Sequence, residues 1–325
     1  MKTSRREFIN KAGLFTSGFI ISLQAPALIR NMEGPVRVGL IADLHQDIMH
    51  DGEKRLDAFL MEMSSTKPDA IIQLGDFAYP NEKNKSVIDK FDNANKNSLH
   101  VIGNHDTDNG HTKQQCLDVW GMSHRYYSHD IGGLRIIVLD CNDVGSPTHK
   151  GGYPLYIGEE QFEWLEEQLK KPDGPILLAS HQPLAGPYSI DNQKEVQALL
   201  GKYQDKVVIS INGHTHIDAL VRIGKIPYLH VNSASYQWVG GDFKHESYPK
   251  EIHEKFPWIE YTCPYKDSLF TTLTFDTSTG TIQIDGSRSE WVGPSPEELG
   301  AKFDEEARNG EEVVAKIRDR EIKKA

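Results

Sequence analysis

The stretch Leu99-His100-Val101-Ile102-Gly103-Asn104-His105-Asp106 joins a short apolar run to a polar turn. Residues 99–102 have the length and character of a buried strand. The glycine that follows lets the backbone turn sharply where a ligand must approach. Asparagine oxygen and imidazole nitrogen are both metal ligands. The stretch therefore predicts a strand of an α/β fold whose carboxyl end carries groups suited to a ligand site.

Four other apolar runs of strand length end in metal-ligand residues in the same way. They are residues 36–42 before Asp43-Leu44-His45, 70–74 before Gly75-Asp76, 176–179 before Ser180-His181-Gln182-Pro183, and 207–211 before Asn212-Gly213-His214-Thr215-His216. In an open α/β sheet the carboxyl ends of the strands form the crevice in which ligands bind. The five runs therefore predict one shared site.

Helical patterns separate these runs, which predicts an α/β class. The three expected helices span residues 52–63, 159–169 and 193–200. Four later strand-like runs follow without helices, at 219–223, 228–231, 269–275 and 281–284, and they indicate a second, largely antiparallel sheet. Residues 237–266 are rich in aromatics, have no clean period and are interpreted as a long loop. Residues 297–325 are interpreted as a charged, solvated helix.

The polar residues at the five strand ends have the chemistry of a two-metal site. The candidate ligands are Asp43, His45, Asp76, Asn104, His181, His214 and His216. Asp43 and His45 share a face of an extended backbone, and the two oxygens of Asp76 can bridge two ions. Imidazoles suit zinc, iron or manganese better than calcium. Seven ligands exceed the need of one tetrahedral ion and suit a pair of divalent ions roughly 3.5–4 Å apart.

The chain is acidic, with 36 Lys+Arg against 47 Asp+Glu in 325 residues and a formal net charge of −11. No basic stripe is present for a nucleic-acid backbone, so nucleic acid is not an expected partner. The charge of a two-metal pocket, in contrast, is positive because two divalent ions outweigh two carboxylates. Such a pocket acidifies a bound water and attracts a phosphate oxygen. The sequence thus favours a small phosphorylated substrate.

The ordered set D-x-H, G-D, G-N-H-D, a lone histidine and G-H-T-H resembles the calcineurin-like metallophosphoesterase superfamily, from about residue 36 to residue 286. The resemblance implies a four-layer α/β/β/α sandwich of two mixed sheets flanked by helices. It also implies that one metal is held by Asp43, His45 and His216, that Asp76 bridges, and that Asn104, His181 and His214 hold the second metal.

The resemblance further implies a metal-dependent phosphoric ester hydrolase that cuts a small phosphomonoester or phosphodiester by attack of metal-bound hydroxide. His105 would contact the phosphate and protonate or stabilise the leaving oxygen. Asp106 is the nearest candidate partner for His105, although a turn-capping role for this aspartate is equally open. A non-catalytic metal- or phosphate-binding module and a nuclease of the same superfamily are the alternatives.

Two departures from related subfamilies bear on the substrate. Gly75-Asp76-Phe77-Ala78-Tyr79 matches the G-D-x-x-Y of purple acid phosphatases, but those proteins lack the histidine that stands here at position 45. Tyr79 is therefore interpreted as pocket wall. The aspartate and arginine of the protein Ser/Thr phosphatases are not found, which disfavours that activity. The aromatic segment 236–266 could cap the metal pocket or pack onto the second sheet.

The N-terminus carries an export signal by three agreeing features. Basic residues Lys2, Arg5 and Arg6 precede an apolar stretch at 13–23 and an A-x-A sequence, Ala25-Pro26-Ala27. Ser4-Arg5-Arg6-Glu7-Phe8-Ile9 resembles a twin-arginine signal. We expect a signal peptide at 1–27, a catalytic domain at 36–290, a charged helical tail at 291–325, passage through the twin-arginine export machinery to the periplasm or beyond, and no stable membrane anchor. Three cysteines do not make a disulfide framework.

Overall fold

The computed structural model describes residues 24–171, 174–303 and 311–323. Residues 1–23 of the predicted twin-arginine signal peptide lie outside the described residues. Its remaining positions, up to residue 27, belong to helix α2 (Gln24–Arg30). Among the described residues no helix has the length and apolar character that crossing a membrane requires. Cys116, Cys141 and Cys263 are buried and unpaired.

The first of two six-stranded sheets has the strand order β16-β13-β12-β1-β2-β3. Its strands are β1 (Val36–Ile41), β2 (Ala70–Gln73), β3 (Ser98–His100), β12 (Thr271–Asp276), β13 (Thr281–Ile284) and β16 (Arg320–Ile322). Strands β1, β2 and β3 are parallel, whereas β12, β13 and β16 add to the other edge in antiparallel pairs. The sheet is therefore mixed.

The second sheet has the order β4-β5-β6-β7-β9-β8. Its strands are β4 (Tyr127–Ile131), β5 (Leu134–Val138), β6 (Ile176–Ser180), β7 (Val207–Asn212), β8 (Ala219–Ile223) and β9 (Ile226–His230). The prediction that the late strands form a sheet of their own is wrong: β8 and β9 extend the second sheet, and β12 and β13 extend the first. The central strands β1 and β7 gain hydrogen-bonding partners in this way, which buried backbone requires.

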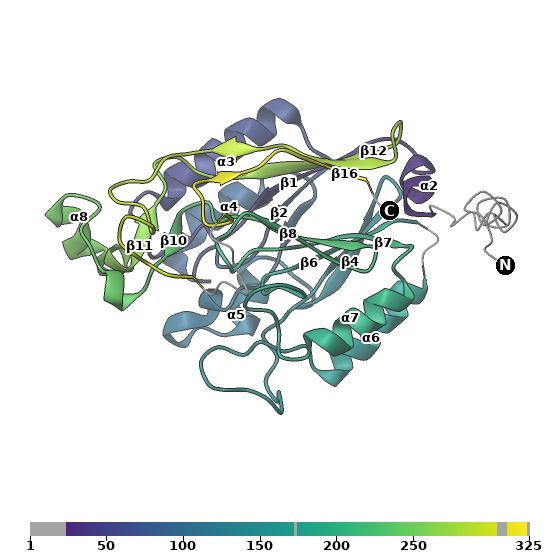
Figure 1. Cartoon of the computed structure of the whole chain (residues 1–325), viewed down its shortest axis with the longest axis horizontal. Helices are drawn as coiled ribbons and strands as arrows, with labels where there is room; N and C mark the ends of the chain where they lie inside the picture. The colour runs from purple at the N-terminus through teal and green to yellow at the C-terminus, as the bar shows by residue number, and fades with distance from the viewer. Residues whose placement is uncertain (1–23, 172–173, 304–310, 324–325) are drawn as a thin grey trace, which may run out of the picture.

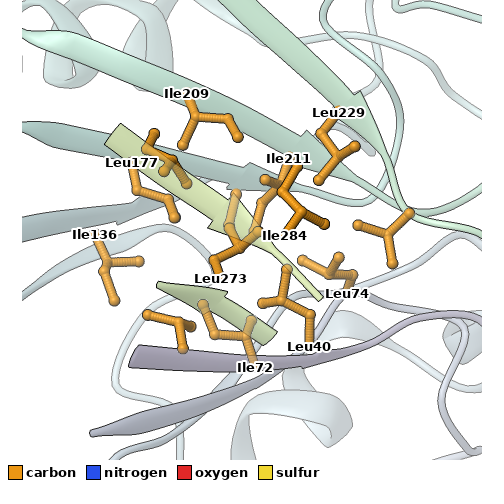
Figure 2. Packing of buried hydrophobic residues seen from close by; sticks show 14 of the residues in the cluster. Leu40, Ile72, Leu74, Ile136, Leu177, Ile209, Ile211, Leu229, Leu273 and Ile284 are labelled. Atoms are coloured by element: carbon orange, nitrogen blue, oxygen red, sulfur yellow. The ribbon is translucent and has the colours of Figure 1, made fainter. Parts of the chain in front are cut away.

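The main core lies between the two sheets (Figure 2). Leu40, Ile72 and Leu273 of the first sheet face Leu177 and Ile209 of the second, and all five are fully buried. Because the central strands are covered on both faces, their residues are mostly apolar, as the sequence indicated.

Helices cover the outer face of each sheet (Figure 1). On the first sheet lie α3 (Gly52–Thr66), α4 (Lys85–Asp92) and α5 (Lys113–Val119), whose buried side chains form one apolar cluster with that sheet. On the second sheet lie α6 (Glu159–Lys170) and α7 (Gln193–Lys202). The predicted four-layer α/β/β/α sandwich is confirmed.

The aromatic segment is not the long loop that its lack of period predicted. It contains β10 (Tyr236–Trp238), a 3-10 turn (Gly241–Phe243), α8 (Lys250–Lys255), a second 3-10 turn (Pro257–Tyr261) and β11 (Thr262–Pro264), at the left end of Figure 1. These elements have at most six residues, too few to show a period. Tyr236 and Ile259 bury themselves with Met49 in a small separate cluster.

The charged helix predicted for the C-terminal tail is wrong for the residues that the structure describes there. This stretch forms β15 (Lys316–Ile317), which pairs with β14 (Ser287–Arg288), and the edge strand β16. Its charges are not all solvated, since Arg318 and Arg320 lie 2.8 Å and 2.6 Å from the carboxylate of fully buried Asp218. The tail is therefore part of the sandwich.

Candidate metal centre

Five strand ends bring the seven predicted ligands to one place. Strands β1, β2 and β3 supply Asp43, His45, Asp76 and Asn104 from the first sheet, while β6 and β7 supply His181, His214 and His216 from the second. The five ligand-bearing strands were treated as parts of one open sheet. In the structure they belong to two sheets, and the site straddles both. The carboxylates and imidazoles form two groups, Asp43, His45 and His216 in one, and Asp76, His181 and His214 in the other.

In the first group, His216 Nε2 lies 3.2 Å from Asp43 Oδ1 and 3.3 Å from His45 Nε2. All three side chains are buried. The pKa of His45 is held well below its usual value, chiefly by burial, so its imidazole is neutral. A neutral imidazole is the form that binds a metal.

In the second group, His181 Nε2 is the common neighbour. It lies 3.1 Å from Asp76 Oδ2, 3.1 Å from Asn104 Oδ1 and 3.2 Å from His214 Nδ1. Burial, followed by the nearby His181, lowers the pKa of His214 well below its usual value. Asn104 therefore joins the second group, as the resemblance implied.

Asp76 lies between the two groups. Its Oδ2 is 3.1 Å from His181 Nε2 and 3.7 Å from His45 Nε2, which belong to different groups. Its Oδ1 accepts a hydrogen bond of 2.8 Å from the backbone N–H of His105. One carboxylate oxygen thus faces both groups, the placement that a bridging ligand needs.

The histidine tautomers show that the site is built for a cation. His181 Nδ1 donates to the carbonyl oxygen of Leu74 at 2.8 Å, and His216 Nδ1 donates to that of Tyr236 at 2.7 Å. In the neutral form of both rings, the Nε2 lone pairs would face oxygen and nitrogen acceptors unless a proton or a metal ion stood between them. Although burial lowers the pKa of His181, the Asp76 carboxylate raises it to about 9. A positive charge therefore belongs between these atoms, and a divalent ion fits that demand.

The backbone of the ligand loops is held in the left-handed region. Positive φ angles occur at Asp43 (52°), His45 (49°), Asp76 (50°), His214 (67°) and His216 (50°). Non-glycine residues adopt this region at a cost, and such residues concentrate at functional sites.

Close packing of the loops requires glycine at two further positions. A Cβ on Gly103 would lie 2.2 Å from the Asp76 backbone nitrogen, and one on Gly75 would lie 2.5 Å from the His181 ring. Only glycine permits the approach of the β2 and β3 loops to each other and to His181.

The Asp106 carboxylate connects the loops that follow β2 and β3. Its carboxylate accepts hydrogen bonds from the backbone N–H groups of Asp76 (2.9 Å), Phe77 (2.8 Å), Ala78 (3.2 Å) and Gly103 (2.7 Å). Burial and the neighbouring Asp76 carboxylate raise the pKa of Asp106 to about 7, while these backbone donors oppose the rise. The structure therefore gives this residue the turn-capping role.

The carboxylate that pairs with His105 is Asp108, so of the two roles left open for Asp106 the pairing with His105 is not the one that the structure gives. Asp108 Oδ2 lies 2.7 Å from His105 Nδ1. The hydroxyl of Tyr153 lies 2.8 Å and 2.9 Å from the two Asp108 oxygens and 3.1 Å from His105 Nδ1. Sequence reasoning missed both partners. An acid three residues after a histidine in a turn was the available signal for Asp108, whereas nothing local marked Tyr153.

A cavity of about 810 Å³ opens over both groups. Its wall includes His45, Asp76, His105, His214 and His216, and also Tyr79, which takes the wall position that the sequence predicted. Burial and the Asp108 and Asp47 carboxylates raise the pKa of Tyr79 to about 12. The aromatic segment contributes to the wall through residues 236–240 and Trp258. The segment therefore lines the cavity, whereas the apolar core that it packs is a small one of its own and not the second sheet.

The fold and the two ligand groups define a class of protein, and comparison with known families agrees. Residues 36–218, more than half of the chain, match the family model described as calcineurin-like phosphoesterase. The chain belongs to this family. Among curated proteins, a probable cyclic nucleotide phosphodiesterase of Fibrobacter succinogenes is 32% identical over 134 residues, which cover 38% of this chain and 47% of that protein. The match thus spans about half the length of this curated relative.

Solved structures share the fold at low identity. A dimetal phosphatase from Danio rerio aligns with a TM-score of 0.56 and 14% identity over 79% of this chain and 98% of its own. GAP50, the anchor in the inner membrane complex of Plasmodium, aligns with a TM-score of 0.53 and 14% identity. The alignment covers 80% of this chain and 85% of that chain. At this identity the two structures support the fold alone.

Proposed function

We propose that this protein hydrolyses a small phosphomonoester or phosphodiester with the help of two divalent metal ions of the manganese, iron or zinc type. The observation that carries the proposal is the bridging position of Asp76 between two ligand groups, with His105 beside them in the wall of one cavity. Membership of the phosphoesterase family supports it. The name of the Fibrobacter relative supports a small phosphodiester among the candidate substrates.

The chain's own residues divide the work. When bound, a metal pair supplies the positive charge that attracts a phosphate group and acidifies a water. The two groups would hold this pair, and bonds to backbone carbonyls orient His181 and His216 for it. His105 has Nδ1 engaged with Asp108, so its Nε2 is the nitrogen left to donate a proton to the leaving oxygen.

His105→Ala tests this role directly. We expect kcat to fall by about 10²–10⁴-fold, because the variant removes a general acid, while the metal content is unchanged. Hydrolysis of alkyl phosphomonoesters and phosphodiesters, whose alkoxide leaving groups need a proton, would be measured beside metal analysis of the same samples. The exposed His124 supplies a control variant, His124→Ala, with wild-type rates. If His105→Ala loses neither hydrolysis nor metal binding, a metal- or phosphate-binding module is favoured instead.

Asp108→Asn separates positioning from folding. We expect little change with a 4-nitrophenolate leaving group and a drop of about tenfold with a poor, alkoxide-type leaving group, because only the latter needs a proton from a correctly oriented His105. Initial rates across a series of leaving groups of graded pKa would measure the effect. An equal loss for every leaving group would show that Asp108 acts through structure alone.

The nuclease alternative and the export expectation each have a simple test. The acidic chain disfavours a polyanion, so single-stranded DNA incubated with the protein and Mn²⁺ is expected to stay intact.

We also propose export through the twin-arginine machinery, because Arg5 and Arg6 precede an apolar stretch. Replacing both arginines with lysine should retain the precursor in the cytoplasm.

A further inference from the structure

Exposed aromatic rings gather at the outer part of the cavity. Trp238 is 42% exposed, Trp258 55%, Tyr153 40% and Tyr188 58%, and all four line it. Within the described part of the chain seven large hydrophobic side chains are exposed, and these four are the aromatic ones among them. Exposed apolar surface that gathers in one place marks a binding site.

The four rings come from separate parts of the fold. Tyr153 lies between β5 and α6, Tyr188 lies between β6 and α7 in a backbone conformation with φ of 53°, and Trp238 ends β10. Trp258 belongs to the 3-10 turn that precedes β11. Three separate stretches of the chain, the aromatic segment and the connections that hold Tyr153 and Tyr188, thus place rings on the same cavity, which chance exposure does not explain.

The two tryptophans are held in place by a third ring. Trp238 stacks parallel to Tyr261, with 5.5 Å between ring centroids and 5° between planes, and Trp258 meets the same tyrosine at 5.2 Å. The Lys244 ammonium lies 4.7 Å from the centroid of Tyr261. The rings are therefore presented in fixed positions, which lowers the entropy lost when a flat ligand stacks on them.

We propose that these aromatic rings bind a planar ring group of the substrate, so that the preferred substrate is a phosphodiester with a flat ring on the ester group that is not the leaving group. This inference rests on the proposed function and specifies its substrate class. The ligand groups lie buried while the rings are exposed, so the phosphate and the planar group occupy the inner and outer parts of one cavity. Its volume of about 810 Å³ is in the range of sites for ligands much larger than phosphate.

The charges of the wall favour a diester. Outside the two ligand groups, the described wall residues that carry charge are Asp108, its partner His105 when protonated, and Lys302. A phosphomonoester carries a second negative charge near neutral pH, and Asp108 opposes the two cations that could meet it. A diester carries one negative charge, and its second ester group can extend toward the rings.

The test compares two diesters with the same leaving group, methyl 4-nitrophenyl phosphate and thymidine 5′-(4-nitrophenyl phosphate), on the metal-loaded full chain. Stacking of a base on an aromatic ring is worth about five- to 150-fold in binding. We expect the thymidine ester to have a kcat/KM larger by that factor, through a lower KM. Equal kcat/KM for the two esters would overturn the inference and leave the proposed function standing.

Variants of the two tryptophans test whether these rings cause the preference for the thymidine ester. Trp238→Ala and Trp258→Ala should each reduce the ratio of the two kcat/KM values several-fold, whereas Met61→Ala, which removes an exposed large side chain outside the cavity, should not. An unchanged ratio in both tryptophan variants overturns the inference, and circular dichroism checks that they fold.

If neither of these esters nor the monoester 4-nitrophenyl phosphate is hydrolysed, the proposed function fails, and the ring site is then tested by binding alone. Quenching of tryptophan fluorescence by thymidine 5′-methyl phosphate but not by dimethyl phosphate would support it. Equal quenching by the two would overturn it.

Discussion

Asp76→Asn is expected to lower the rate of phosphoester hydrolysis by roughly 10³-fold or more and to reduce the bound metal below two ions per chain. Asparagine tolerates the positive φ of this position, and its oxygen can still accept from the His105 N–H. The change therefore removes the bridging charge with little change of shape. Metal pairs supply several kcal/mol of catalysis, and each 1.36 kcal/mol is a factor of ten.

The matched control is Asp118→Asn, because Asp118 is an exposed aspartate of α5. It should keep the wild-type rate and metal content. Metal analysis and kinetics on the same preparations decide the outcome. Two bound ions and an undiminished rate in Asp76→Asn would contradict the bridging role and, with it, the proposed site.

Replacing both Arg318 and Arg320 with alanine is expected to lower the free energy of unfolding by about 3 kcal/mol. The two guanidinium groups lie 2.8 Å and 2.6 Å from the carboxylate oxygens of Asp218, which is fully buried. Breaking a buried ion pair costs about 3–5 kcal/mol because it leaves an uncompensated charge. We take the lower end because the Arg318 side chain is 35% exposed. Denaturant titration followed by circular dichroism measures the change.

Two further variants make this prediction specific. Lys323→Ala breaks an exposed pair with Glu321 and should cost less than about 0.5 kcal/mol. Adding Asp218→Asn to the double variant removes the stranded charge and should recover part of the loss. No recovery would mean that the arginines stabilise the tail by packing rather than by charge.

The strands and their polar ends could be predicted from sequence because each carries a local signal. An apolar run of four to seven residues followed by a ligand-type residue is visible without any partner strand. Sheet membership has no such signal. Strand β12 pairs antiparallel with β1 although about 230 residues separate them, and only the contacts of the folded chain decide that pairing.

Some residues of the site could likewise be predicted from local sequence, whereas others depend on contacts between distant parts of the chain. The seven candidate ligands belong to short motifs, and the structure brings these residues together. Tyr153 reaches His105 and Asp108 from more than 40 residues away, so its role depends on the course of the chain between β5 and α6. The sequence left the role of Asp106 open between pairing and capping, because its four backbone donors come from two loops that meet only in the fold.

The C-terminal tail was predicted as a helix because its charges follow no strand period. Strands β15 and β16 have two and three residues, which is too few to alternate visibly. Their place is fixed by the ion pairs to Asp218 and by the pairing of β16 with β13. Both interactions are non-local.

Each of the two ligand groups draws residues from both sheets, so metal affinity and the packing of the sheets are thermodynamically linked. An ion held by Asp43 and His216 is bound only when the first and second sheets keep their relative position. By mass action, one ion at 100 times its dissociation constant adds about 2.7 kcal/mol to the stability of the folded chain. A metal pair would therefore fasten the two halves of the sandwich to each other, and shortage of metal in the environment would reduce the lifetime of the folded protein as well as its turnover.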